Sequence, residues 1–230
     1  MRVPRGVPSI DGGRPLPDVT EASPELLAVG GTMTVERLLE AYGKGIFPWS
    51  VNPVTWWSPD PRAIFDLKTV HIPRRLRSLV KSHPYRVSFD EAFEQVMHAC
   101  ADVPRAQEET WITPGFLAAY AELHRAGYAH SIELWRGNEL VAGVYGVAIG
   151  GLFAGESMFH RETNASKLAL ILLQERLIQS GYVLFDTQMV TEVTEMLGAH
   201  EIPRKKYMER LQEALHVSAK WPSSKGGLEV

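Results

Sequence analysis

The sequence predicts an α+β protein built on a mixed β-sheet with flanking helices. From its central region onward the chain is expected to form helices, then an antiparallel hairpin, then a strand–helix–strand unit, an order typical of this fold class. The hairpin is indicated by two apolar or alternating segments, 130–135 and 140–147, on either side of Gly137 and Asn138. With 230 residues, 45% of them hydrophobic and 22% charged, the chain is long enough to bury a sizeable core.

The first elements follow from helix caps and turn residues. Residues 1–24 are rich in Pro, Gly and Arg, and we expect them to be poorly ordered, at least in part. Thr34 is a suitable N-cap for a helix over 35–42, which Gly43 would end. Residues 45–61 are rich in Trp and Pro, which favours a rigid aromatic loop over a regular element.

Short helices and one strand are predicted in the next part of the chain. A helix is expected over 73–82, and a short strand over 85–87. Ser88 and Glu91 have the spacing of a capping box, which predicts a helix that reaches about residue 100. A further helix is predicted over 113–127, because a Thr-Pro pair opens it and a glycine ends it.

The C-terminal third is predicted to alternate strands and helices. Two short, mostly apolar segments that end in polar residues predict strands over 152–156 and 182–188. Between them, Asn164 is expected to cap a helix that ends at Gly181. The remaining predicted elements are a short helix over 192–197, a strand over 200–203 and a final helix over 204–215.

Composition and motif spacing argue against several classes of function. No apolar run reaches membrane-spanning length, and the N-terminus lacks the apolar segment of a secretory signal. Cys100 is the only cysteine, so we expect no intrachain disulfide and a cytoplasmic location. The eight histidines lack metal-ligand spacing, so no metal site is predicted. The net charge of −3 means that nucleic-acid binding would need a local basic patch.

Three polar residues stand at the ends of the two predicted strands near the C-terminus: Glu156, Asp186 and Gln188. Such positions hold functional sites in many α/β architectures, although polar residues there also cap ordinary turns. Asp186 and Gln188 are two residues apart, so on a regular strand they point to the same face. We therefore expect the Asp186 carboxylate to hold the Gln188 amide in one orientation.

Segments in a specific order carry a family resemblance through almost the whole chain. They include Leu27-Ala28-Val29-Gly30-Gly31, Gly45-Ile46-Phe47-Pro48-Trp49, Trp56-Trp57-Ser58-Pro59-Asp60-Pro61-Arg62, Thr110-Trp111-Ile112-Thr113-Pro114, Ala129-His130-Ser131-Ile132-Glu133, Gly155-Glu156-Ser157-Met158-Phe159, Phe185-Asp186-Thr187-Gln188 and Leu197-Gly198-Ala199-His200-Glu201-Ile202-Pro203-Arg204. With these motifs the chain resembles the bacterial leucyl/phenylalanyl-tRNA–protein transferases. The resemblance implies a GNAT-like (N-acetyltransferase-like) domain over residues 63–230, preceded by a small N-terminal domain over residues 1–62.

The resemblance also implies an activity without a cofactor. Such an enzyme moves Leu or Phe, with Met as a third candidate, from aminoacyl-tRNA to the α-amine of a protein that begins with Arg or Lys. The product carries an N-terminal degradation signal. In this reading the Gln188 carbonyl accepts a proton from the amine, Asp186 orients Gln188, and Glu156 helps to hold the aminoacyl end or the amine. Both carboxylates would attract a basic N-terminus.

Further residues are implied in substrate binding, each with a plain structural alternative. Trp49 and Trp111, with Tyr42 and Tyr120 near them in sequence, would hold the terminal adenosine and its aminoacyl group, or else pack in the core. An apolar pocket for the transferred side chain, with ordinary core as the alternative, is implied at Met158, Leu170, Leu173, Leu177 and Phe185. Contacts to tRNA phosphates, with a solvated helix face as the alternative, are implied at Arg74, Arg75, Arg77 and Lys81.

The sequence departs from the family pattern at Thr32, Thr187, Val193 and Met196, and also at Val144, where Met or Leu is frequent. Two other functions remain open at this level. The first is a coenzyme-A-dependent N-acyltransferase of the same fold, which the glycine-free predicted turn at 157–163 disfavours, because a pyrophosphate needs close backbone approach. The second is a non-catalytic RNA-binding protein that keeps the basic helix and the Trp residues.

Overall fold

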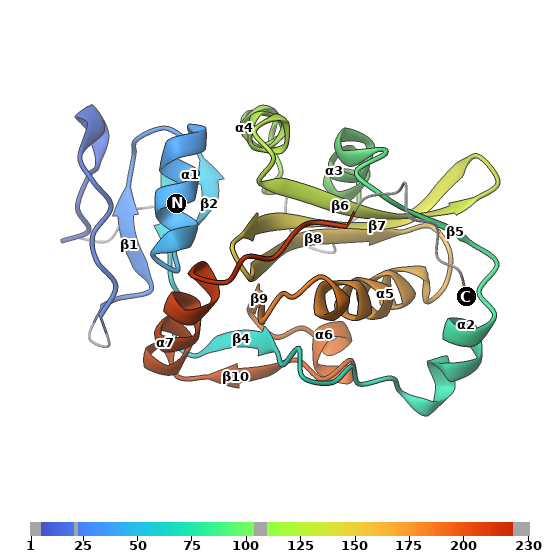
Figure 1. The fold of residues 1–230 in the computed structure, drawn as a ribbon. Coiled ribbons are helices and arrows are strands. Elements are labelled where there is room, and N and C mark those ends of the chain that lie inside the picture. Colours follow the sequence, from blue (N-terminus) through green and yellow to red (C-terminus); the bar gives the residue numbers. More distant parts are fainter. Residues whose placement is uncertain (1–5, 21–22, 104–109, 223–230) are drawn as a thin grey trace.

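The computed structural model describes residues 6–20, 23–103 and 110–222, which form two β-sheets with helices around them (Figure 1). The helices are η1 (Asp11–Gly13), α1 (Val35–Gly43), η2 (Arg74–Leu76), α2 (Arg77–Lys81), α3 (Phe93–Ala101), α4 (Pro114–Arg125), α5 (Ala165–Gln179), α6 (Glu192–Met196) and α7 (Arg204–Leu215). The strands are β1 (Leu26–Val29), β2 (Phe47–Val51), β3 (Val54–Trp57), β4 (Arg62–Phe65), β5 (Arg86–Phe89), β6 (Ala129–Arg136), β7 (Glu139–Ile149), β8 (Leu152–His160), β9 (Leu184–Gln188) and β10 (His200–Ile202). Nowhere in these ranges does a helix combine the length and apolar character needed to traverse a bilayer.

The smaller sheet has the order β1-β3-β2, and its neighbouring strands are antiparallel. Two of these strands lie within residues 45–61, so the prediction of an aromatic loop there is wrong. The Val, Thr and Trp side chains of β3 suit a pleated, half-buried surface, and Pro48 is tolerated because β2 is an edge strand. The Ser50 hydroxyl donates to the carbonyl oxygen of Pro53 at 2.6 Å, which ties the turn between β2 and β3.

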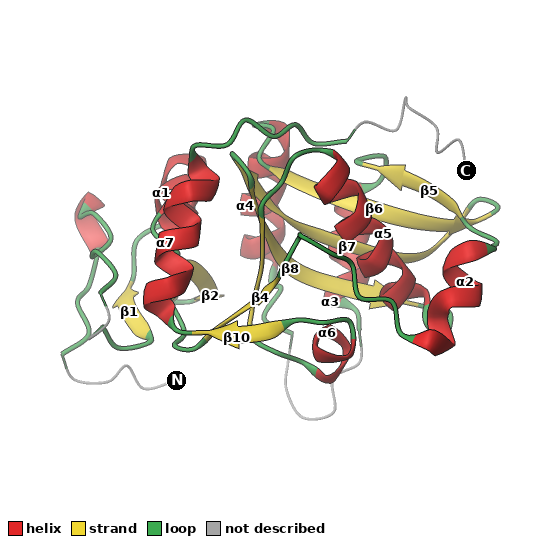
Figure 2. Cartoon of the chain, turned by 60° about the horizontal axis from the view of Figure 1, so that its bottom comes forward, coloured by secondary structure: helices red, strands yellow, loops and turns green. Residues whose placement is uncertain are grey.

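The larger sheet has the order β10-β4-β9-β8-β7-β6-β5. Strands β8 and β9 run parallel, and the other neighbouring pairs in this sheet are antiparallel. Helix α5 connects the parallel pair and lies across one face of the sheet, while α3 and α4 cover the opposite face (Figures 1 and 2). The predicted α+β fold with a mixed sheet and flanking helices is therefore confirmed, and so is the predicted hairpin, which is observed as β6 and β7.

One hydrophobic core joins the two sheets. Tyr42 of α1 and Trp56 of β3 belong to the same buried cluster as Phe116 of α4 and Tyr145 of β7. A second buried cluster fills the space between α5 and the other face of the large sheet. The hydrophobic cluster that contains Tyr42 includes residues on both sides of residue 62. The division into two domains at that residue therefore stays a prediction.

Two predicted helix and turn boundaries are wrong. Ser88 lies inside β5, where its hydroxyl donates to Glu133 at 2.5 Å, so it forms no capping box and α3 begins at Phe93. Strand β8 continues to His160, so the turn predicted over 157–163 shrinks to residues 161–164. This shorter turn also contains no glycine.

Three other segments differ in detail from the prediction. The basic helix predicted over 73–82 is divided into the short elements η2 and α2. Asn164 occupies the N-cap position of α5 with a φ of 65°, but its side-chain oxygen accepts from Lys167 at 2.9 Å instead of from the helix backbone. At the start of the chain, Ile10 and Leu16 are buried, so residues 6–20 pack on the protein although poor order was expected.

Candidate active site

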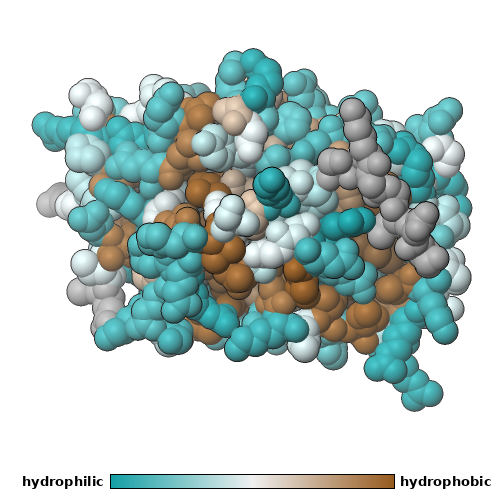
Figure 3. Space-filling view, viewed as in Figure 1, coloured by the Kyte–Doolittle hydropathy of each residue, from teal (hydrophilic) through white to brown (hydrophobic). Residues whose placement is uncertain are grey.

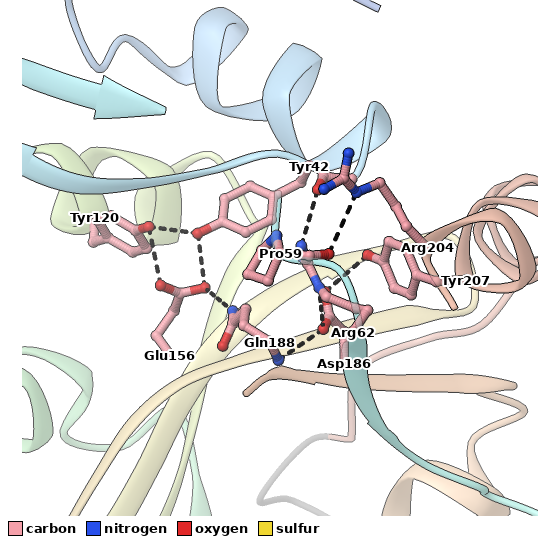
Figure 4. A network of polar contacts seen from close by, with 10 residues as sticks. Tyr42, Pro59, Arg62, Tyr120, Glu156, Asp186, Gln188, Arg204 and Tyr207 are labelled. Carbon is pink, nitrogen blue, oxygen red and sulfur yellow. Dashed lines mark hydrogen bonds and ion pairs between the residues drawn. The ribbon is translucent and has the colours of Figure 1, made fainter. Parts of the chain in front are cut away.

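Glu156 lies at an irregular position in β8. Its neighbours Gly155 and Ser157 pair with Gly146 and Tyr145 of β7, so Glu156 is the extra residue of a β-bulge. A bulge redirects the side chain that it contains. The Glu156 carboxylate consequently reaches hydroxyl and amide donors that come from three other elements (Figure 4).

Those donors surround the carboxylate closely. Tyr42 of α1 donates to Oε1 at 2.7 Å, Tyr120 of α4 donates to Oε2 at 3.3 Å, and Gln188 of β9 donates to Oε1 through Nε2 at 3.1 Å. The hydroxyls of Tyr42 and Tyr120 also contact each other at 2.5 Å. Burial and the nearby carboxylate raise the pKa of both tyrosines well above the ordinary range, so they stay protonated as donors.

The environment of Glu156 favours its neutral form. Burial raises the pKa of Glu156 from 4.5 to about 7, and the negative charge of Asp186 adds to the effect, although the Tyr42 hydrogen bond opposes it. A carboxyl group with this pKa exchanges protons readily near neutral pH, which suits a general acid or base.

Gln188 has a strained backbone at the end of β9. Ala63 of β4 pairs with Gln188 and Ile64 pairs with Asp186, so Thr187 forms a second bulge. The φ of Gln188 is 57°, and the amide N–H of Met189 donates to the Thr187 carbonyl oxygen at 2.6 Å. This is a γ-turn centred on Gln188 with a positive φ, which is rare and strained for a residue other than glycine.

The expected contact between the two side chains of β9 is not formed. The Gln188 side-chain amide donates to Glu156, and the one bond that Gln188 makes to Asp186 in the described part of the chain comes from its backbone N–H, at 2.9 Å. The prediction that the Asp186 side chain holds the Gln188 amide is wrong, because the bulge at Thr187 breaks the regular alternation of side chains.

Asp186 is instead the centre of a buried ion pair. The Arg62 guanidinium donates to both of its carboxylate oxygens, through Nε at 2.9 Å and Nη2 at 2.6 Å, and Tyr207 donates to Oδ2 at 2.8 Å (Figure 4). The sequence analysis missed Arg62 and Tyr207. One signal was available: Arg62 is a lone charge that begins a short apolar strand, and such a charge needs a buried partner.

Two adjoining pockets open onto Glu156 and Gln188. The first is lined on one side by Phe47, Pro48, Trp49 and Trp111, and the second by Val144, Met158, Leu170 and Phe185. Residues that line both pockets are Glu156, Thr187, Gln188, Met189 and Thr191. Each pocket has a volume of more than 200 Å³, about 240 Å³ for the first and about 220 Å³ for the second.

The fold separates the predicted substrate residues into two groups. Trp49 and Trp111 line the first pocket, and Met158, Leu170 and Phe185 line the second. The others do not belong to the described pocket walls: Leu173 and Leu177 are buried in the core beside α5, and Tyr42 and Tyr120 stand behind Glu156 as its donors.

The predicted basic residues lie on the surface of η2 and α2. Arg74, Arg75, Arg77 and Lys81 are all exposed, and hydrophilic side chains project at the lower right of Figure 3, where α2 lies in Figure 1. The Arg75 guanidinium contacts the Met196 sulfur of α6. Thr194, also in α6, lines the second pocket. Helix α6 therefore contacts the basic segment and also contributes to the pocket wall.

The departures at Thr32, Thr187, Val193 and Met196 leave the polar centre intact. Val193 and Met196 of α6 are partly buried against the core beside α5, and Thr32 is exposed. The Thr187 hydroxyl is buried without a hydrogen-bond partner among the described residues. Its position between Asp186 and Gln188 makes Thr187 the one of these four departures that is next to the polar centre in sequence.

The fold also brings together one group with the donor types of a metal site. Ligand atoms of Asp90, His124 and His130 lie within 4.8 Å of one another, although their sequence spacing predicted no such site. Asp90 accepts from the Ser131 backbone and contacts His130 Nδ1 at 2.7 Å, while His124 Nδ1 contacts the Ala129 carbonyl oxygen. These bonds account for the cluster as a structural network away from the pockets.

Comparisons with known proteins identify the family of the chain. The family model of the leucyl/phenylalanyl-tRNA protein transferase matches residues 64–212, and the model of its N-terminal domain matches residues 31–60. The leucyl/phenylalanyl-tRNA–protein transferase of Shewanella baltica (strain OS155 / ATCC BAA-1091) is 48% identical over 202 residues, which is 86% of this chain and 85% of that protein. The protein of the same name from Shewanella sp. (strain MR-4) is also 48% identical, over 86% of each chain.

Solved structures show a more distant likeness. The structure of L-PGS from Bacillus licheniformis has a TM-score of 0.40 and 15% identity, and covers 80% of this chain and 64% of that chain. A GCN5-related N-acetyltransferase from Kribbella flavida has a TM-score of 0.39 and 11% identity, and covers 71% of this chain and 59% of that chain. On the family models and on the 48% identity to a relative that is matched over 85% of its length, the chain belongs to the leucyl/phenylalanyl-tRNA–protein transferase family.

Proposed function

We propose that the protein is an aminoacyltransferase that moves Leu or Phe, with Met as a third candidate, from its tRNA to the α-amine of a protein beginning with Arg or Lys. The observation that carries this proposal is the meeting of two pockets at one carboxyl group, Glu156, beside the Gln188 amide. A transfer reaction needs a donor and an acceptor held on either side of one proton-accepting group.

The pocket walls support an aminoacyl-adenosine as the donor. The rings of Trp49 and Trp111 line the first pocket, and unstacked bases at the end of a tRNA bind by stacking on aromatic faces. Met158, Leu170 and Phe185 give the second pocket an apolar wall. Its volume of about 220 Å³ exceeds that of an apolar cavity of about 150 Å³ that holds benzene, so a Leu or Phe side chain fits.

We assign the proton transfer to Glu156. The acceptor amine attacks the ester carbonyl carbon, a C–N bond forms, and the C–O bond to the adenosine ribose breaks. The amine proton passes to the Glu156 carboxylate, and the protonated Glu156 then gives this proton to the ribose oxygen, which leaves as a hydroxyl. A carboxyl group with a pKa of about 7 is a better base than the amide oxygen of Gln188, which then serves to position the amine.

The charges at the site support a basic acceptor. Asp186 and Glu156 were both expected to attract a positively charged N-terminus, but Asp186 is buried and paired with Arg62. Only Glu156 of the two lines a pocket in the described part of the chain, so it is the carboxylate that an N-terminal Arg or Lys would approach. The product would carry Leu or Phe as an N-terminal degradation signal.

The surface cations support binding of the tRNA body. Arg74, Arg75, Arg77 and Lys81 extend from η2 and α2 on an otherwise acidic chain. Contacts between cations and phosphates position a nucleic acid without reading its sequence. Such contacts suit an enzyme that accepts several tRNAs charged with the same amino acid.

The decisive experiment is a transfer assay with defined substrates. The protein is incubated with Leu-tRNA, Phe-tRNA or Met-tRNA and with a peptide that begins with Lys, Arg or, as a control, Ala, and the peptide is weighed by mass spectrometry. We expect a gain of one Leu or Phe residue on the Lys and Arg peptides only. No gain with any tRNA, together with acetylation by acetyl-CoA in a parallel reaction, would favour the coenzyme-A enzyme instead. Binding of the tRNA without any transfer would favour the RNA-binding protein.

A further inference from the structure

We propose that Arg62 is a positioning residue, which fixes Asp186 so that Gln188 is held beside Glu156 in its strained conformation. The inference rests on the proposed transferase function, because it concerns the placement of groups for that reaction. It adds a residue that lies outside both pockets to the machinery of the site.

The first step in the argument is that Gln188 needs external support. Its φ of 57° and the γ-turn through Met189 are unfavourable for a residue with a side chain. Its backbone N–H donates to Asp186 Oδ1 at 2.9 Å, and its side chain donates to Glu156 at 3.1 Å. The Asp186 carboxylate is therefore the group that holds this turn in place.

The second step is that Asp186 has no free oxygen with which to act on a substrate. Oδ1 accepts from Arg62 Nε and from the Gln188 backbone, and Oδ2 accepts from Arg62 Nη2 and from Tyr207. Asp186 is fully buried. With these four hydrogen bonds, the Asp186 carboxylate stabilises the end of β9 and is not available to react with a substrate.

The third step is that Arg62 connects both walls of the first pocket. Its remaining nitrogen, Nη1, donates to the Gly45 carbonyl oxygen at 3.1 Å, and its guanidinium lies 5.0 Å from the ring centre of Phe47. Phe47 and Gln188 both line this pocket. A single planar side chain thus fixes the strand that carries Gln188 relative to the wall that begins β2.

The geometry requires arginine and not merely a positive charge. A guanidinium offers donors in a fixed fork, whereas a lysine ammonium is a compact charge that cannot make the same parallel pair of bonds. Gly45, whose carbonyl oxygen accepts from this fork, packs tightly against α7: a Cβ added there would come 2.9 Å from both the Tyr207 ring and the Met208 sulfur. The close approach leaves little room for a different arrangement.

The chain offers a matched control in Arg204. This arginine is also buried, and its side chain donates to the carbonyl oxygens of Thr20, Ser23 and Pro59. Within the described residues it makes no contact with Asp186 or Gln188 (Figure 4). Its replacement by Lys tests what the loss of a buried guanidinium does when no site residue depends on it.

The experiment compares Arg62→Lys with Arg204→Lys in the full chain. Steady-state transfer of Leu to a Lys peptide gives kcat and the KM for Leu-tRNA, and urea unfolding gives the stability of each variant. A misplacement of about 1 Å at a reacting group can reduce a rate about 100-fold. We expect Arg62→Lys to lower kcat by at least about tenfold with the KM within about twofold of wild type, because the tRNA contacts are untouched. Both substitutions should lower the urea midpoint, because each removes a buried guanidinium, but Arg204→Lys should leave kcat near wild type.

A second variant keeps the inference testable if Arg62→Lys does not fold. Tyr207→Phe removes one of the four hydrogen bonds to Asp186 and keeps the ring, so it should lower kcat by a smaller factor without a change in KM. Equal kcat in wild type and in whichever Arg62 or Tyr207 variant folds would overturn the inference. Inactive wild type would overturn the proposed function instead, so the two failures are distinguishable.

Discussion

Replacement of Glu156 by Gln should make the protein more stable and less active at the same time. The amide keeps the shape of the side chain and can still accept from Tyr42 and Gln188, but it carries no charge and takes no proton. Burial of a charged carboxylate is unfavourable, so the wild type loses stability whenever Glu156 ionises in the folded state.

The size of the effect follows from the pKa of Glu156, which is about 7 in the folded protein against an ordinary value of 4.5. This difference corresponds to roughly 3 kcal/mol, because one pKa unit is worth about 1.4 kcal/mol. The sign is that of an acid with a raised pKa: its contribution to stability is fully present below pH 4.5 and is lost as the pH rises through about 7. The charges that act on Glu156 are those of Asp186, which raises the pKa, and Arg62, which lowers it.

Urea unfolding of wild type and Glu156→Gln at pH 5 and pH 8 measures this contribution directly. The variant should be more stable than wild type at pH 8 by up to about 3 kcal/mol, and this difference should shrink to less than about 1 kcal/mol at pH 5. Glu156 is partly exposed to the pockets, and contact with water there would make the difference in stability smaller than this upper limit. In single-turnover transfer the wild-type rate should rise with pH through about 7, and the variant should be slower by about 100-fold or more. An equal pH dependence of stability in the two proteins would refute a neutral, buried Glu156, and a near-native rate in the variant would refute its role as the base.

Three further substitutions test the other parts of the site. Reversal of Arg74 and Arg77 to Glu should weaken tRNA binding and flatten its salt dependence, and unchanged affinity at low salt would remove η2 and α2 from the tRNA interface. Met158→Ala enlarges the second pocket and should shift preference from Leu toward bulkier side chains by roughly 1–3 kcal/mol, which competition between Leu-tRNA and Phe-tRNA measures; an unaltered ratio would show that Met158 does not contact the donor. Asp186→Asn and Gln188→Ala should each lower the single-turnover rate, and the double variant should be little worse than the poorer single one, since one residue acts through the other. Fully additive losses would contradict that coupling.

The local sequence predicted most of the fold because the relevant signals were short in range. The Gly137-Asn138 turn between apolar segments gave the hairpin, and Thr34 gave the start of α1, where its hydroxyl accepts from the Arg37 N–H. The smaller sheet was missed because Trp and Pro residues suit both an aromatic loop and an edge strand. Its strands form only because β3 finds partners on both sides, which no local pattern reveals.

Glu156, Asp186 and Gln188 lie close together, as the sequence predicted, but their hydrogen-bond partners were not predictable. Motif resemblance identified Glu156, Asp186 and Gln188, yet the pairing among them depends on two bulges that shift strand register by one residue. A single extra residue moves a side chain to a different neighbour, so the sequence spacing of Asp186 and Gln188 gave the wrong contact. The partner of Asp186 is Arg62, which is 124 residues away in sequence, and only the sheet order brings the two together.

The buried cluster that Tyr42 and Trp56 share with Phe116 and Tyr145 has a consequence for how the enzyme discriminates between substrates. Rotation of one sheet against the other would expose this cluster to water, so we expect the two sheets to move little against each other. We therefore expect selection of the donor to depend on complementarity with the pocket walls more than on a domain closure. An engineered change of specificity would accordingly have to be made in the pocket walls themselves, because a longer connection between β3 and β4 would add no mobility.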